Sequence, residues 1–297
     1  MEVDLSQLGT PDVIETLSFE TLLAEIKADL VARYPAIAGT IDLESEPTLK
    51  LLEVAAYREL QLRARYNDEA RELLLAFAED ADLDHIGATY YQEGRLVVTP
   101  EDTSTTPPTP AVMETDKDYR YRLSLKPESY SVAGPRDAFK FHALSADGQV
   151  KDASVTSPYG GTTKVYILSR TGDGTAAPEL IATVQAALDA ETIRPLSEEV
   201  IVAAGTITAY TLDIGLILYP GASTELAIAT ADKGLSAYAA DHHKLDSDIV
   251  KSAIDAAAHN SGVKEVIIRS PAANVVCDVG HAPYCTAITV AVDGIEA

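Results

Sequence analysis

The chain has 297 residues, of which 46% are hydrophobic, and its 46 acidic and 23 basic side chains give a formal net charge of -23 at pH 7. This length is sufficient for about two or three domains with cores of their own. So acidic a chain repels nucleic-acid phosphates and anionic membranes, which argues against a nucleic-acid-binding or membrane-surface role.

The N-terminal residues Met1-Glu-Val-Asp4 are acidic and no apolar stretch follows them, which argues against a signal peptide. No run in the sequence approaches the roughly 20 apolar residues that a membrane-spanning helix needs. We therefore expect synthesis and folding in the bacterial cytoplasm.

Two helices are predicted in the first third of the chain. Ser18 can cap a helix over residues 18–34 that stops before Pro35. Ser45-Glu-Pro47 then supplies a cap, an acid at the positive end of a helix and a proline in its first turn. Because neither Gly nor Pro occurs from there to about residue 78, the pattern predicts a helix of ~30 residues, well above the average length.

The long helix carries apolar residues at near-heptad spacing, which is typical of a helix that packs along another helix. A second apolar face is marked by Leu51, Ala55 and Leu62, and Leu74 widens the surface near the end. Only the helix at 18–34 is near enough in sequence to cover two faces, so we predict a helical bundle with partner chains; packing within one domain is the alternative. The predicted partner interface consists of Leu49, Leu52, Ala56, Leu60, Tyr66, Ala70, Leu73 and Phe77.

A linker separates this helical arm from the rest. After a short strand expected at residues 96–98, residues 99–110 contain four prolines and five threonines and lack an apolar period. We expect this segment to hold an extended path between the arm and the following domains.

The remaining sequence alternates helices and strands, which predicts two successive small α+β units. The first has helices at 116–125, 135–146 and 177–190, strands at 149–156, 163–169 and 199–203, and a hairpin turn at 157–161. The second has strands at 206–218, 263–269 and 286–292 and helices at 223–240 and 247–259. The predicted fold class is therefore α+β, with an N-terminal helical arm at 1–98, a Pro/Thr-rich linker at 99–115, a middle domain at 116–205 and a C-terminal domain at 206–297.

No motif reaches the specificity of an active site. The Gly-rich segment from Ser169 to Thr175 could cradle a phosphate, but it lacks the Lys-Ser/Thr ending of a P-loop, so we interpret it as a strand-to-helix loop with glycines at positive φ. His242 and His243, with two aspartates nearby, are the densest candidate for a metal site. Adjacent histidines point in different directions, so we interpret them as surface loop residues. We predict no catalytic, cofactor-binding or metal-binding residues.

The two cysteines, Cys277 and Cys285, are too few for a disulfide framework. We interpret them as core or loop thiols, because disulfides are rare in proteins made in the cytoplasm; a bridge between the two is the alternative.

Short motifs follow one another in a fixed order along nearly the whole chain. They include Ser131-Val-Ala-Gly-Pro-Arg136, Leu168-Ser-Arg-Thr-Gly-Asp-Gly-Thr175, Arg194-Pro-Leu196, Tyr219-Pro-Gly221 and Asp248-Ile-Val-Lys-Ser-Ala-Ile254. Together with Leu43-Glu-Ser-Glu-Pro47, they resemble the J-type baseplate proteins of contractile-tailed phages and phage-tail-like bacteriocins. Their shared order is more specific than any one of them.

The resemblance implies a structural wedge component of a tail baseplate, with no catalytic activity and no cofactor. In similar proteins, two copies join one neighbouring wedge protein through a helical core bundle, and the C-terminal domains link wedges into a ring around the central spike and tube. The implied partners are a second copy of the chain, a neighbouring wedge protein, a sheath-initiator-like protein and the central spike or hub, in a phage or phage-tail-like particle. The alternatives are a tail-associated hydrolase and a monomeric ligand-binding module.

Overall fold

A computed structural model describes residues 9, 11, 13–131 and 133–296. It divides the chain into two compact units, a first unit up to Gly94 and a second unit from Arg95 onward. Helices and mixed sheets together confirm the predicted α+β class. The acidic residues Met1–Asp4, which argue against a signal peptide, lie outside the described residues.

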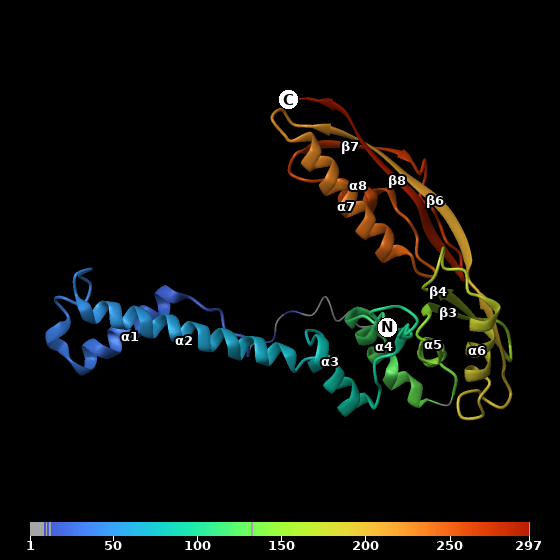
Figure 1. The fold of residues 1–297 in the computed structure, drawn as a ribbon, viewed down its shortest axis with the longest axis horizontal. Helices are drawn as coiled ribbons and strands as arrows, with labels where there is room; N and C mark the ends of the chain where they lie inside the picture. The colour runs from blue at the N-terminus through green and yellow to red at the C-terminus, as the bar shows by residue number, and fades with distance from the viewer. Residues whose placement is uncertain (1–8, 10, 12, 132, 297) are drawn as a thin grey trace. The chain divides into compact units, whose positions relative to one another are not determined.

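The first unit is helical. Helix α1 (Phe19–Arg33) begins where Ser18 Oγ accepts a hydrogen bond from Thr21 N at 3.3 Å, which confirms the predicted cap. It lies alongside α2 (Figure 1). The unit continues through η2 (Pro35–Ile37), α2 (Pro47–Glu72), α3 (Asp80–Ile86) and the π-helical turn η3 (Gly87–Tyr91).

Helix α2 differs from its prediction at both ends. Its cap is Glu46, whose carboxylate accepts a hydrogen bond from Thr48 N at 3.2 Å, and not Ser45. It ends at Glu72 after 26 residues instead of continuing to about residue 78. Turn hydrogen bonds, such as that from Ala78 N to Leu74 O at 2.9 Å, replace the helical ladder while Ala78 becomes fully buried. A helix can therefore end without Gly or Pro when turns and packing satisfy the chain beyond it.

The segment predicted as an extended linker folds back on itself instead. Strand β1 (Val97–Thr99) pairs antiparallel with β2 (Val112–Met113), and Asp102 forms a β-bridge with Thr109 inside the loop. The carboxylate of Asp102 accepts a hydrogen bond from Ser104 N at 2.8 Å. Asp, Ser and Thr side chains favour such turns by bonding to the nearby backbone, and this effect outweighs the extended tendency of the prolines.

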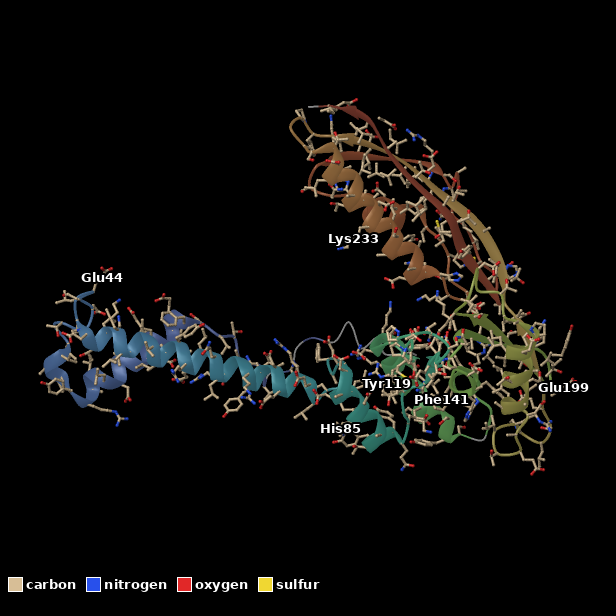
Figure 2. The ribbon with its side chains drawn as sticks, viewed as in Figure 1. Glu44, His85, Tyr119, Phe141, Glu199 and Lys233 are labelled. Atoms are coloured by element: carbon tan, nitrogen blue, oxygen red, sulfur yellow. The ribbon has the colours of Figure 1, made fainter. Side chains whose placement is uncertain are left out.

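The middle module, residues 116–204, contains every helix and strand predicted for it. A three-stranded sheet has the order β3-β4-β5, with β3 antiparallel to β4 and β4 parallel to β5. The buried core includes Phe139, Val165, Ile167 and Leu188, and Figure 2 shows Phe141 among the crowded side chains of this module. The elements are α4 (Asp116–Leu125), η4 (Lys126–Tyr130), α5 (Arg136–Ala146), β3 (Val150–Tyr159), β4 (Thr162–Ser169), α6 (Pro178–Leu188) and β5 (Glu199–Ala204).

A side chain of α6 closes part of the outer edge of this sheet. Gln185 Nε2 donates to Val200 O at 2.8 Å, and Gln185 Oε1 accepts from Val202 N at 2.8 Å. The amide thus bonds to β5 as a neighbouring strand would.

The C-terminal module, residues 206–296, has a sheet of order β7-β6-β8, with β7 antiparallel and β8 parallel to β6. Helices α7 and α8 lie on the same face of this sheet (Figure 1). They cross closely, because a Cβ on Gly234 would lie 2.1 Å from Ala257 O. The elements are β6 (Thr206–Leu218), α7 (Thr224–His242), α8 (Lys251–Ala258), β7 (Val263–Ser270) and β8 (His281–Ile295).

Two elements of this module differ from their predictions. Strand β8 is longer than the predicted strand at 286–292, because its parallel register with β6 runs from His281 to Ile295. Helix α8 begins at Lys251 instead of residue 247, because Ile249 forms a β-bridge with Val275 in front of it. Both differences arise from pairing with distant segments.

Candidate partner-binding surface

Helix α1 covers one face of α2. Leu22 and Leu23 of α1 form a buried cluster with Ala56 of α2, and Leu52 and Leu60 pack against that cluster. Leu49, on the same face, is also buried. These residues recur at spacings of three and four, so they lie on one side of the helix.

Residue Glu15 covers the same side further along α2. Asn67 is 8% exposed, and its Oδ1 accepts from Glu15 N at 3.1 Å while its Nδ2 donates to Glu15 O at 2.9 Å. Arg63 Nη1 also donates to the Glu15 carboxylate at 3.0 Å. Hydrogen bonds to Glu59 and Glu15 raise the pKa of Arg63. The inner face of α2, from Leu49 to Asn67, is therefore occupied by the chain itself.

A second side of α2 exposes apolar side chains. Leu51 is 70% exposed, Leu62 49% and Leu73, at the helix end, 78%. We call this row the outer stripe; it consists of Leu51, Ala55, Leu62, Tyr66 and Leu73. Its successive spacings alternate between four and seven residues, an eleven-residue repeat that keeps all five on one side of a helix. Figure 2 shows side chains standing out from α2 along its length.

A separate hollow lies beside the outer stripe. It has a volume of about 640 Å³ and is lined by Phe19, Glu53, Val54, Tyr57, Arg58 and Gln61. Val54 and Tyr57 are each more than half exposed. Their positions on the helix place them on a different side from the outer stripe. The first unit thus offers two exposed apolar surfaces along α2.

The eight residues of the predicted interface fall into different environments. Leu49, Leu52, Ala56 and Leu60 lie on the inner face against the chain itself. Tyr66 and Leu73 belong to the outer stripe, whereas Ala70 and Phe77 are half-buried. The interface itself stays a prediction. Residues that periodicity had marked as a second face, Leu51, Ala55 and Leu62, are the exposed ones.

The other candidate sites take structural roles. The Gly-rich segment is a strand-to-helix loop, as predicted, with φ of +63° at Gly172 and +96° at Gly174. The interpretation of the histidines as surface loop residues is wrong, because His242 ends α7 and His243, half-buried, bonds through Nδ1 to Pro283 O at 2.8 Å. Among the described residues, no group of three or more His, Cys, Asp or Glu is placed to hold a metal ion.

Both cysteines are free thiols, which confirms the preferred interpretation. Burial raises the pKa of the Cys277 thiol and of the Cys285 thiol. Across the part of the chain that the structure describes, no helix has the length and apolar character needed to cross a membrane.

Comparisons with known proteins identify three consecutive family domains. The model described as Baseplate J-like N-terminal domain matches residues 44–102, the Baseplate J-like central domain matches residues 131–204, and the Baseplate J-like protein C-terminal domain matches residues 210–291. The chain is also 47% identical over 299 residues to baseplate protein J of Escherichia phage P2, a match that covers 99% of each chain.

Proposed function

Because the chain belongs to the baseplate J-like family, we propose that it is a structural component of a phage-tail baseplate and forms part of a baseplate wedge. The full-length similarity to a baseplate protein supports the role as a baseplate component. The outer stripe is the observation that supports the role in a wedge, because exposed apolar residues in a row mark a surface that another chain covers.

The outer stripe supports a helical bundle with partner chains. Its eleven-residue repeat keeps the apolar side chains in one row that suits the side of another helix, and burying each large apolar side chain there contributes about 1.5–3 kcal/mol before the costs of association. The hollow at Val54 and Tyr57 gives α2 a second apolar contact surface. Two such surfaces allow two neighbouring helices, for which we propose a second copy of this chain and a neighbouring wedge protein.

The C-terminal module is proposed to link wedges into a ring around the central spike or hub and to contact a sheath-initiator-like protein. Its sheet has both helices on one face (Figure 1), and the other face carries half-exposed apolar residues such as Ile267. A sheet face of this kind is available for pairing with another module. The proposed roles are assigned to an arm at residues 1–98, a linker at 99–115, a middle domain at 116–205 and a C-terminal domain at 206–297.

We propose further that the chain has no catalytic activity. The named relative is a baseplate protein, and the candidate loop and histidines contribute to folding in this structure. A glycan-release assay that shows turnover by the purified chain would contradict this proposal and favour a tail-associated hydrolase.

Light scattering on the chain, alone and co-expressed with the tail protein encoded next to it, tests the bundle. We expect a 2:1 complex that is lost in a Leu62→Asp, Leu73→Asp double variant, because charge on the outer stripe opposes burial. Leu196→Asp is the matched control, since Leu196 is 96% exposed in the middle module and lies outside the first unit. A chain that stays monomeric when co-expressed with the neighbouring tail protein, or a stripe variant that still assembles, would exclude this interface.

A further inference from the structure

The second unit has two cores, but the chain passes between them without a spacer. Strand β5 ends at Ala204 and β6 begins at Thr206. Gly205 N donates to Ile167 O of the middle sheet at 2.9 Å, whereas Thr206 N donates to Gly280 O of the C-terminal module at 2.8 Å. Successive residues therefore belong to different modules.

A second segment, residues 243–246, crosses the same boundary directly after α7, and we call it the clasp. Leu245 N donates to Oδ2 of Asp152 on β3 at 2.9 Å. The Leu245 side chain is 6% exposed and forms a cluster with Leu168 of the middle module and Ala282 of the C-terminal module. The clasp thus buries an apolar side chain in a core that both modules build.

Asp152 is a strong acceptor for the clasp because it is both buried and ion-paired. It is 8% exposed, and its Oδ1 lies 3.3 Å from Lys140 Nζ. Burial disfavours the charged form of Lys140, but Asp152 and Tyr121 together hold the pKa of Lys140 above its ordinary value. Hydrogen bonds to a charged, buried acceptor are stronger than neutral ones, and the donor is costly to leave unpaired.

The next residue of the clasp bonds to both modules through one carboxylate. Asp246 Oδ2 accepts from Ser154 Oγ of β3 at 2.5 Å, and Asp246 Oδ1 accepts from Gly280 N at 2.7 Å. Its own N donates to His281 O at 2.8 Å. Asp246 has φ of +60°, a left-handed conformation that Asp tolerates better than most residues.

Glycines allow the two modules to approach this closely. A Cβ on Gly205 would lie 2.7 Å from Leu245 Cδ2, and one on Gly280 would lie 2.6 Å from Tyr166 Cγ. A Cβ on Gly174 of the middle module would lie 2.9 Å from His243 Nε2. Any of these contacts is too short for a real side chain, so the boundary is packed as tightly as a core.

We propose that the clasp fuses the middle and C-terminal modules into one rigid body, which moves and unfolds as a whole and does not bend at residue 205. Adjacent domains usually move relative to one another unless their interface is well buried. At this boundary only one residue separates the two sheets along the chain. The same boundary has a buried, ion-paired hydrogen-bond acceptor and an apolar cluster shared by both modules.

Hydrogen exchange by mass spectrometry on the full-length chain tests the clasp. In the wild type, we expect the peptide that contains Leu245 to exchange as slowly as the peptide that contains the core residue Leu216. In Asp152→Ala the Leu245 amide loses its acceptor, so its exchange should accelerate about tenfold or more while Leu216 changes less. Calorimetry should then resolve two transitions in the second unit where the wild type shows one.

A control variant outside the clasp and a milder variant within it accompany Asp152→Ala. Asp213→Ala is the matched control, because it removes an aspartate that pairs with Arg269 at 3.1 Å, outside the clasp, and should leave Leu245 exchange unchanged. If Asp152→Ala fails to fold, Ser154→Ala, which removes only a hydroxyl, decides the question by faster exchange at Gly280 and Leu245. Separate transitions in the wild type, or unchanged exchange in the clasp variants, would overturn the proposal.

Discussion

The two units use their apolar residues in opposite ways. In the second unit, Ile167, Ile214 and Leu216 are fully buried in two cores. In the first unit, α1 covers one face of α2 while Leu51 and Leu73 remain largely exposed on the other. The difference indicates that the second unit is stabilised within itself, whereas the first unit leaves part of its apolar surface exposed, the surface for which we propose contacts with other chains.

Charged residues give the sharpest contrast between the units. In the second unit, Arg122 and Glu114 are 1% and 5% exposed and pair at 2.8 Å, so Arg122→Ala should cost about 3–5 kcal/mol by leaving the Glu114 carboxylate buried without its ion-pair partner. In the first unit, Arg65 pairs with Glu69 in solvent, so Arg65→Ala should cost about 0.5 kcal/mol or less. Chemical denaturation of both variants measures the difference, and equal costs would contradict the comparison.

Glycines test how tightly each unit is packed. Gly234→Ala should destabilise the C-terminal module by about 1–3 kcal/mol, because the new methyl group meets the backbone oxygen of Ala257. Gly39→Ala in the first unit is the control, since nothing lies within 4 Å of the added Cβ. Equal shifts of the unfolding temperature in the two variants would show that α7 and α8 move apart to accept the methyl group.

Neighbouring alanines on α2 distinguish its two sides within one helix. Ala56→Leu should destabilise the first unit by about 1–3 kcal/mol, because Ala56 is fully buried against α1. Ala55 lies on the exposed outer stripe, so the effect of Ala55→Leu on the stability of the isolated chain should stay within about 0.5 kcal/mol. Helical circular dichroism during denaturation follows both variants. A larger loss of stability from Ala55→Leu than from Ala56→Leu would show that α1 covers the other side of α2.

The smallest expected effect is a pH dependence of the second unit through His243. Burial lowers the pKa of His243 and outweighs its hydrogen bond to Pro283 O and the charge of Asp173, while Lys151 lowers the pKa further. The unfolded chain therefore binds a proton at a higher pH than the folded one, and stability falls as the pH drops below the ordinary histidine pKa of about 6.5. His243→Gln should lose less stability than the wild type between about pH 7.5 and 5.5 in urea titrations. Parallel curves would exclude His243 as the source.

Local patterns predicted the fold well where local forces decide it. The predicted strand at 206–218 has the same bounds as β6, and Ser18 caps α1 as expected. The misses came from contacts that are remote in sequence. The length of β8 is set by its register with β6, and the end of α2 is set by turns and by the burial of Ala78.

The surface of α2 shows a similar limit. Spacing identified two apolar faces, but it could not tell which one α1 would cover, because Leu51 and Leu52 are equally apolar and differ by one position. One signal was present in the sequence. Asn67 falls on the side of Leu49, Ala56 and Leu60, and a polar residue within an apolar row indicates a specific hydrogen-bonded contact, here to the backbone of Glu15.

The hydrogen bonds of Gln185 bear on aggregation. An open strand at the edge of a sheet invites strands of other copies to add to it, and fibrous stacking follows. On β5, Val200 O and Val202 N are already bonded to the Gln185 amide. If the outer stripe stays exposed until partner chains bind, as proposed, the bonded edge of β5 keeps the unassembled chain from growing into fibrils at this strand.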